Sequence, residues 1–169
     1  EYGEALNRFR QYVNLESNQQ TPAYADAYNR IGDCLFHNRQ FAMAEENYTR
    51  AAQLQPSAGD YSVYQKGFLL GLQKDYKGKI SVMDRLIRDF PESQYVDDAL
   101  FEKGRSYVLL DNNQAAAASF EQLMRDFPQS SLARKAGVQL GLIYFNDNQP
   151  EKAAEAYKSV ISNYPGSED

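Results

Sequence analysis

The 169-residue chain has one cysteine, one histidine and no tryptophan. The lone cysteine, Cys34, excludes an intrachain disulfide and a cysteine-rich zinc site, and the lone histidine, His37, excludes metal motifs that need two histidines. No apolar run approaches the ~20 residues that span a bilayer. A net charge of −5 argues against a nucleic-acid partner, because phosphate binding needs a basic surface. We therefore expect no metal, no nucleic acid and no membrane insertion in this segment.

The sequence also lacks the short motifs of common enzymes. It contains no glycine-rich phosphate loop, no G-x-S-x-G nucleophile motif and no H-E-x-x-H zinc motif. Cys34 and His37 are three residues apart, which would allow a Cys–His pair on one helix face, but no third residue is placed to orient them. We expect no catalytic residue and no cofactor, and hence a protein that is not an enzyme.

The sequence does contain a clear period. Proline recurs with separations of 35, 37 and 37 residues, at Pro56, Pro91, Pro128 and Pro165. Glycine recurs with the same separations, each time 24 residues before a proline, at Gly32, Gly67, Gly104 and Gly141. Two residue types that share one varying period indicate an internal repeat.

Each repeat has the apolar spacing of two helices. In the first repeat, Tyr28, Ile31 and Leu35 lie at helical spacing, and the polar residues 37–40 then interrupt the pattern. A second apolar set follows and ends at a proline, which cannot continue a helix: Phe41, Ala44, Tyr48, Ala51, Leu54 and Pro56. The repeat is therefore predicted to be an antiparallel helical hairpin.

These positions resemble the tetratricopeptide repeat (TPR), in which a bulky residue and a small-residue pair mark the first helix, and Ala, an aromatic, a small residue and Pro mark the second. The resemblance covers nearly the whole chain and implies an all-α, right-handed superhelical solenoid of antiparallel helix pairs. Two positions depart from the family. Lys79 replaces the usual Ala, so we expect poor local packing there. Gly137 replaces the usual bulky residue, which predicts a gap that a neighbour fills.

The resemblance makes residues 1–169 a single array of about four and a half repeats. The full repeats span 25–58, 60–93, 97–130 and 134–167, and residues 1–17 match the second helix of a truncated repeat. Pro165 and Ser167 have the same spacing as Pro91 and Ser93, and as Pro128 and Ser130, where the serine precedes the first helix of the next repeat. We therefore expect the chain to be a fragment of a longer array.

A longer pattern runs from Pro91 through Ser93 to Gly104 and recurs from Pro128. It resembles TPRs of bacterial cell-envelope proteins, such as the periplasmic TolA-binding protein and the lipoprotein of the outer-membrane assembly machinery. This resemblance implies a periplasmic or outer-membrane-associated location in a Gram-negative bacterium, with a cytoplasmic location as the alternative. This resemblance does not identify any functional residue in the present chain.

In the TPR family the concave face is lined by positions two, five, nine, twelve and thirteen of each repeat, when the repeated glycine is position eight. From these positions we select nine partner-binding candidates: Asn29, Asp33, Tyr61, Tyr64, Phe68, Phe101, Arg105, Val138 and Leu142. The remaining inward positions hold Asp26, Phe36, His37, Gly71, Leu72, Asp98, Val108, Leu109, Lys135, Phe145 and Asn146.

The apolar candidates are expected to form a stripe with Tyr64, Phe68 and Phe101 as its contact core, while Asp33 and Arg105 set the polar register. The alternative is that extra helices, a neighbouring domain or a second copy covers this stripe. A clamp for a terminal carboxylate is not expected, because only Asn29 and Arg105 suit that role and they lie two repeats apart.

The resemblance thus implies a non-enzymatic interaction scaffold that binds a peptide or protein in the concave groove. Two alternatives stay open. One is self-association into a homo-oligomer, and the other is an accessory array of a larger envelope protein or enzyme.

Overall fold

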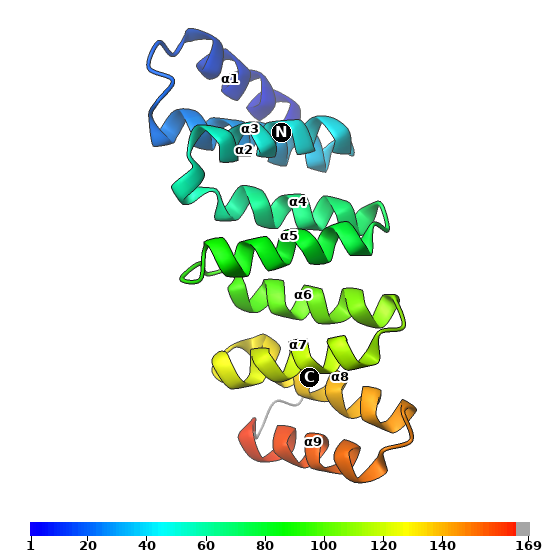
Figure 1. The fold of residues 1–169 in the computed structure, drawn as a ribbon. Coiled ribbons are helices and arrows are strands. Elements are labelled where there is room, and N and C mark those ends of the chain that lie inside the picture. Colours follow the sequence, from blue (N-terminus) through cyan, green and yellow to red (C-terminus); the bar gives the residue numbers. More distant parts are fainter. Residues whose placement is uncertain (165–169) are drawn as a thin grey trace. The chain divides into compact units, whose positions relative to one another are not determined.

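The computed structural model describes residues 1–164, and these contain nine α-helices and no strand (Figure 1). The helices are α1 (Tyr2–Leu15), α2 (Pro22–His37), α3 (Phe41–Leu54), α4 (Asp60–Leu72), α5 (Tyr76–Asp89), α6 (Val96–Leu109), α7 (Asn113–Asp126), α8 (Ser131–Asn146) and α9 (Pro150–Asn163). A short 3₁₀ turn, η1 (Pro56–Ala58), precedes α4. The all-α class expected from the periodicity is confirmed. Pro165 and Ser167, on which the expected end of the last repeat depends, lie outside the described residues.

The chain divides into two compact units, residues 1–86 and 87–169. In unit 1, α2 and α3 form a hairpin, α1 packs on α2, and α4 packs on α3. In unit 2, the hairpins α6–α7 and α8–α9 are joined through α7 and α8, and α6 also contacts α8. Each unit is therefore built by stacking helix pairs, as expected for repeats that cannot bury their own apolar faces.

Helix starts and turns follow from local chemistry. Thr21 caps α2 by accepting a hydrogen bond from the Tyr24 N–H at 3.1 Å, with Pro22 at the first helical position. The turn after each first helix contains a residue with φ between 56° and 61°. These residues recur with separations of 35, 37 and 37, like the glycines: Arg39, Lys74, Asp111 and Asn148.

The repeated glycines mark the close approach of the two helices in a pair. A Cβ added at Gly32 would lie 2.6 Å from the ring of Tyr48, and one added at Gly104 would lie 2.6 Å from the ring of Phe120. Both rings are buried. The first helix can rest on the aromatic ring of the second only because glycine has no side chain there, which explains the glycine period.

The two departures from the family pattern pack in different ways. At Gly137, Val160 and Met124 occupy the space of the missing side chain, as expected. At Lys79 the long side chain is accommodated beside a glycine of the preceding helix. This side chain is buried to 8% exposure and runs past Gly71, where a Cβ would lie 3.1 Å from the Lys79 Nζ. A glycine on α4 therefore makes room for a long side chain on α5.

Substituting one repeated glycine tests the close approach. In an open helix Gly→Ala stabilises by up to about 1 kcal/mol. Gly104→Ala is expected to do the opposite and lower the free energy of unfolding by about 1–3 kcal/mol, because the new methyl overlaps the buried Phe120 ring. Urea unfolding followed by circular dichroism measures this difference.

The matched control is Gly3→Ala in α1, where a Cβ meets no atom within 4 Å. It is expected to leave the stability unchanged or to raise it. If Gly104→Ala proves as stable as Gly3→Ala, the helices of this pair are not held apart by the ring and the contact is wrong.

Candidate functional site

The nine candidate residues lie on the first helices of the helix pairs. Unit 1 contributes Asn29 and Asp33 from α2 and Tyr61, Tyr64 and Phe68 from α4. Unit 2 contributes Phe101 and Arg105 from α6 and Val138 and Leu142 from α8. Their environments differ sharply, and this difference separates residues that hold the helices together from residues that face outward.

Asn29 lies inside unit 1. Its side chain is buried, and its Oδ1 accepts a hydrogen bond from the Ser62 hydroxyl at 2.9 Å. The bond joins α2 to α4, two successive first helices. Asn29 therefore fixes the register between neighbouring repeats, and its amide oxygen is not presented to the surface.

Asp33 is the centre of a polar cluster that joins three helices. Its Oδ1 accepts hydrogen bonds from the hydroxyls of Tyr48 on α3, at 2.8 Å, and Tyr61 on α4, at 2.7 Å. Its Oδ2 accepts one from Arg30 on α2, at 2.7 Å. The Arg30 guanidinium also lies over the Tyr61 ring, 5.0 Å from the centroid. Both carboxylate oxygens are thus engaged within the protein.

The cluster changes the acidity of its two phenols. Burial, together with the hydrogen bond and charge of Asp33, raises the pKa of Tyr61 to about 12. The same causes raise the pKa of Tyr48 further still. Both phenols therefore keep their protons, and donate to Asp33, throughout the neutral range.

The aromatic candidates of unit 1 lie on α4. The rings of Tyr64 and Phe68 meet edge to face with centroids 5.4 Å apart, and Phe68 is exposed. Leu72, one turn further along, is exposed as well. The buried Lys79 side chain lies behind Phe68, with its ammonium 5.5 Å from the ring centroid. Sequence reasoning missed this contact, although Gly71 on the preceding helix was a signal that a long side chain could pass.

In unit 2 the candidates on α6 contact other side chains of the protein, whereas those on α8 are exposed to solvent. The Phe101 ring packs against Phe120 at 5.6 Å and is half-buried. Arg105 is exposed and pairs with Glu102 at 2.9 Å. Val138 and Leu142 are both exposed on α8. Two inward positions outside the candidate set, Leu109 and Phe145, are exposed too.

Two surfaces follow, one in each unit. The unit 1 inner face consists of Tyr61, Tyr64, Phe68 and Leu72. The unit 2 inner face consists of Phe101, Arg105, Leu109, Val138, Leu142 and Phe145. Of the ten exposed large apolar side chains in the described part of the chain, six belong to these faces, and all six occupy inward positions of the repeat: Phe68, Leu72, Leu109, Val138, Leu142 and Phe145.

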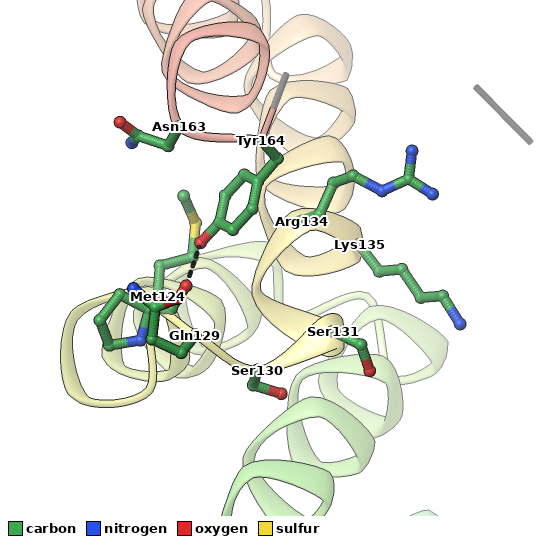
Figure 2. Close-up of a pocket in the computed structure, with 9 residues that line it drawn as sticks. Met124, Gln129, Ser130, Ser131, Arg134, Lys135, Asn163 and Tyr164 are labelled. Carbon is green, nitrogen blue, oxygen red and sulfur yellow. Dashed lines mark hydrogen bonds between the residues drawn. The ribbon is translucent and has the colours of Figure 1, made fainter. Parts of the chain in front are cut away.

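A hollow of about 740 Å³ lies in unit 2 between the end of α7, the start of α8 and the end of α9 (Figure 2). The Tyr164 hydroxyl donates to the Pro128 carbonyl at 3.0 Å beside it. Arg134 and Lys135 extend from the first turn of α8, away from Met124 (Figure 2). The first turn is capped internally, since the Ser130 Oγ accepts from the Leu132 N–H at 3.1 Å. The hollow therefore lies beside the start of α8, whose first turn is already capped by Ser130.

The lone cysteine gives no sign of nucleophilic chemistry. Cys34 is buried in α2, and burial, followed by the charge of Asp33, raises the pKa of its thiol. Among residues 1–164, no group of three or more His, Cys, Asp or Glu side chains is placed to hold a metal ion. No described helix is long and apolar enough to cross a membrane.

Comparisons with known proteins agree on the repeat. Two sequence models of the tetratricopeptide repeat match this chain, one over residues 25–58 and the other over residues 98–130 and 135–167. No curated protein matches the sequence. The crystal structure of MamA is similar with a TM-score of 0.78 at 15% identity, over 96% of this chain and 88% of that one.

Two further solved structures are similar in fold. MamA from Desulfovibrio magneticus RS-1 has a TM-score of 0.76 at 18% identity, over 99% of this chain and 88% of that one. The repeats of a putative kinesin light chain from Podospora anserina have a TM-score of 0.71 at 15% identity, over 96% and 86%. At these identities the likeness concerns the fold alone.

The Asp33 cluster predicts a specific loss of stability in alkali. The pKa of Tyr61 is about 12 in the folded protein and about 10 in an unfolded chain. A phenol that holds its proton more tightly when folded stabilises fully below pH ~10, and this stabilisation disappears as the pH rises through the folded pKa. The stability difference between the wild type and Tyr61→Phe is therefore expected to shrink from pH ~10 to pH ~12.

Urea unfolding at a series of pH values measures this difference. Below pH ~10, Tyr61→Phe is expected to be less stable by about 1 kcal/mol, because it loses a hydrogen bond to a carboxylate. Tyr12→Phe is the control, since Tyr12 on α1 takes no part in the cluster. A difference for Tyr61→Phe that stays constant over the whole alkaline range would contradict the assignment.

Proposed function

Because the chain belongs to the tetratricopeptide-repeat family, we propose that it is an interaction scaffold that binds a protein or peptide partner on its inner faces. TPR families generally bind proteins and are not enzymes, and the proposal assigns this chain the same kind of role. The proposed binding residues are the aromatic and aliphatic side chains of α4, α6 and α8 that form the two inner faces.

The observation that carries the proposal is where apolar surface is left exposed. Most large apolar side chains of the described residues are buried or half-buried, yet α4, α6 and α8 keep Phe68, Leu72, Leu109, Val138, Leu142 and Phe145 exposed at the family's inward positions. Contiguous exposed apolar surface commonly marks a binding site. Tyr and Phe also provide large contact area at a small cost in rotamer entropy.

The polar candidates take a supporting role in this proposal. Asp33 and Asn29 hold α2 against α4 through Tyr61 and Ser62. They therefore position the aromatic residues of α4 and do not themselves contact the partner. The contact residues of unit 1 are Tyr64 and Phe68.

Self-association is the second candidate function. Two large apolar side chains outside the inner faces, Leu15 on α1 and Ile161 on α9, are 75% and 71% exposed, and a second copy could cover them. Sedimentation velocity over a wide concentration range separates the two functions. A single monomer boundary at every concentration is expected for the scaffold, and a concentration-dependent dimer that Leu15→Ser or Ile161→Ser abolishes would favour self-association.

The location is proposed from the sequence pattern alone. The Pro-x-Ser spacing of residues 91–104 and 128–141 resembles TPRs of bacterial envelope proteins, which supports a periplasmic or outer-membrane-associated location. Fractionation of cells that express the full-length protein tests this. Recovery in the cytoplasmic fraction would contradict it.

The partner-binding role of unit 1 is tested by removing the paired rings of Tyr64, which is half-buried, and Phe68, which is exposed. The double variant Tyr64→Ala, Phe68→Ala is expected to abolish partner capture, because it removes the outer aromatic surface of α4. Affinity capture followed by mass spectrometry identifies the partner, and calorimetry with the purified partner measures the loss. Helical content by circular dichroism is expected to stay unchanged.

The matched control is Met43→Ala, Ile161→Ala, which removes two exposed apolar side chains from α3 and α9. This control is expected to bind the partner like the wild type. If binding survives the α4 double variant and is lost in the control, the partner is held by another surface.

A further inference from the structure

Charge is distributed unevenly between the two units. Residues 1–86 contain 10 Lys or Arg and 10 Asp or Glu, whereas residues 87–169 contain 8 and 13. Unit 2 therefore carries the whole net charge of −5. An acidic unit would be expected to show acidic side chains on every face.

The inward positions of unit 2 do not follow this trend. They include two cations, Arg105 and Lys135, and a single acid, Asp98. Asp98 lies in the first turn of α6, where an acidic side chain is favoured by the helix dipole. The other acids of unit 2 are therefore placed away from the inward positions, and the unit 2 inner face is apolar with a basic edge.

The apolar part of this face has the geometry of a helix-packing ridge. Val138, Leu142 and Phe145 follow one another at i, i+4 and i+7 on α8 and are 43%, 45% and 65% exposed. Leu109, 56% exposed, lies on the neighbouring α6. Side chains spaced in this way pack into the groove of another helix.

The basic part of the face lies beside that ridge. Arg105 precedes Leu109 by one helical turn and therefore lies on the same side of α6. Its side chain is 56% exposed, while its partner Glu102 is 11% exposed and lies beneath it. Glu102 engages Nη1 at 2.9 Å, and a guanidinium carries five N–H donors, so this bond leaves donors of the 56% exposed Arg105 side chain for a further carboxylate.

We propose that the unit 2 inner face binds an amphipathic helix of another protein, whose apolar residues pack on Val138, Leu142 and Phe145 and whose acidic side chain pairs with Arg105. This proposal rests on the proposed scaffold function and specifies its partner. A carboxylate suits Arg105 because it can accept two parallel N–H bonds from the guanidinium. The net charge of unit 2 does not oppose this pairing, since charges more than ~8 Å apart are largely screened at physiological salt.

A second copy of this chain fits the face poorly. In a symmetric dimer through this surface, each unit 2 inner face would meet the same face of the other copy, and this face contains the cation Arg105 and no acidic residue to pair with it. Outside the inner faces, the described helices offer no comparable ridge. The exposed large apolar residues there are Tyr2 and Leu15 at opposite ends of α1, Met43 on α3 and Ile161 on α9. The occupant is therefore a different chain.

A selection from displayed helices tests the partner chemistry directly. A yeast-displayed library of helical peptides, randomised on one face, is selected for binding to the whole 169-residue protein. The selected helices are expected to combine an apolar i, i+4, i+7 ridge with Asp or Glu beside it. Their binding is expected to weaken as the salt concentration rises.

Variants then locate the binding. Leu142→Ser is expected to weaken binding of the selected helices at least tenfold. Ile161→Ser, a substitution at a more exposed site on α9, is expected to leave their binding unchanged. Arg105→Gln is expected to weaken them about two- to fivefold, the range of a partly exposed ion pair. Arg105→Lys is expected to retain the preference for acidic helices. Thermal unfolding of each variant checks that Glu102 tolerates the change.

A double-substitution cycle isolates the charge pair. Replacing the acidic residue of a selected helix by Gln is expected to cost the same two- to fivefold in the wild type and nothing further in Arg105→Gln. Equal losses in both backgrounds would show that the acid does not meet Arg105 and would overturn the pairing.

The remaining outcomes separate this inference from the proposed function. Selected helices that are neutral or basic but still need Leu142 would overturn the acidic-helix inference and leave the scaffold function standing. A library that yields no binders, or binders as sensitive to Ile161→Ser as to Leu142→Ser, would count against both. If sedimentation shows a homodimer that Leu142→Ser abolishes, the unit 2 inner face binds a second copy of this chain and not a helix of another protein, which would overturn the inference.

Discussion

The whole architecture depends on one repeated contact, in which the backbone of a first helix rests directly on a large side chain of the second. The contact joins Gly32 to Tyr48, Gly104 to Phe120 and Gly141 to Tyr157, always 16 residues apart. In the second pair Met83 takes the aromatic position against Gly67, again 16 residues on. Burying a large side chain stabilises by roughly 1.5–3 kcal/mol, which exceeds the ~1 kcal/mol that glycine costs in a helix. The flexible thioether of methionine adapts to the same space that an aromatic ring fills elsewhere.

Hydrogen bonds between successive first helices add to the apolar contacts that hold the repeats together. Asn29 and Ser62 join α2 to α4 in unit 1, and the Ser130 hydroxyl donates to Asp97 at 2.6 Å to join α8 to α6 in unit 2. Burial and a charged partner make such bonds stronger than exposed ones. They set the register between successive first helices. Side chains used for this purpose are no longer available to a partner, and the outer surface of these helices is left mainly to apolar residues.

Much of the proposed binding surface could be predicted from local spacing. The helical period and the repeated glycine identify which residues of a first helix face inward, and Phe68, Val138 and Leu142 are exposed there. Two polar candidates behaved differently. The partners of Asn29 and Asp33 lie 33 and 28 residues away on α4, so no pattern within one helix shows that their oxygens are engaged. The position of the Lys79 side chain could not be predicted either, because it depends on the space beside Gly71 on another helix.

The amino-acid sequence by itself determined the helices, their pairing into hairpins and the face of each first helix that turns inward. These properties depend on apolar spacing and on glycine and proline positions within about 37 residues. Only the tertiary structure decided which polar side chains hold the helices together and how the long Lys79 side chain is buried beside Gly71. The physical reason is that a hydrogen bond needs its two atoms within about 3 Å, a distance between separate helices that side-chain packing sets and residue spacing alone does not encode.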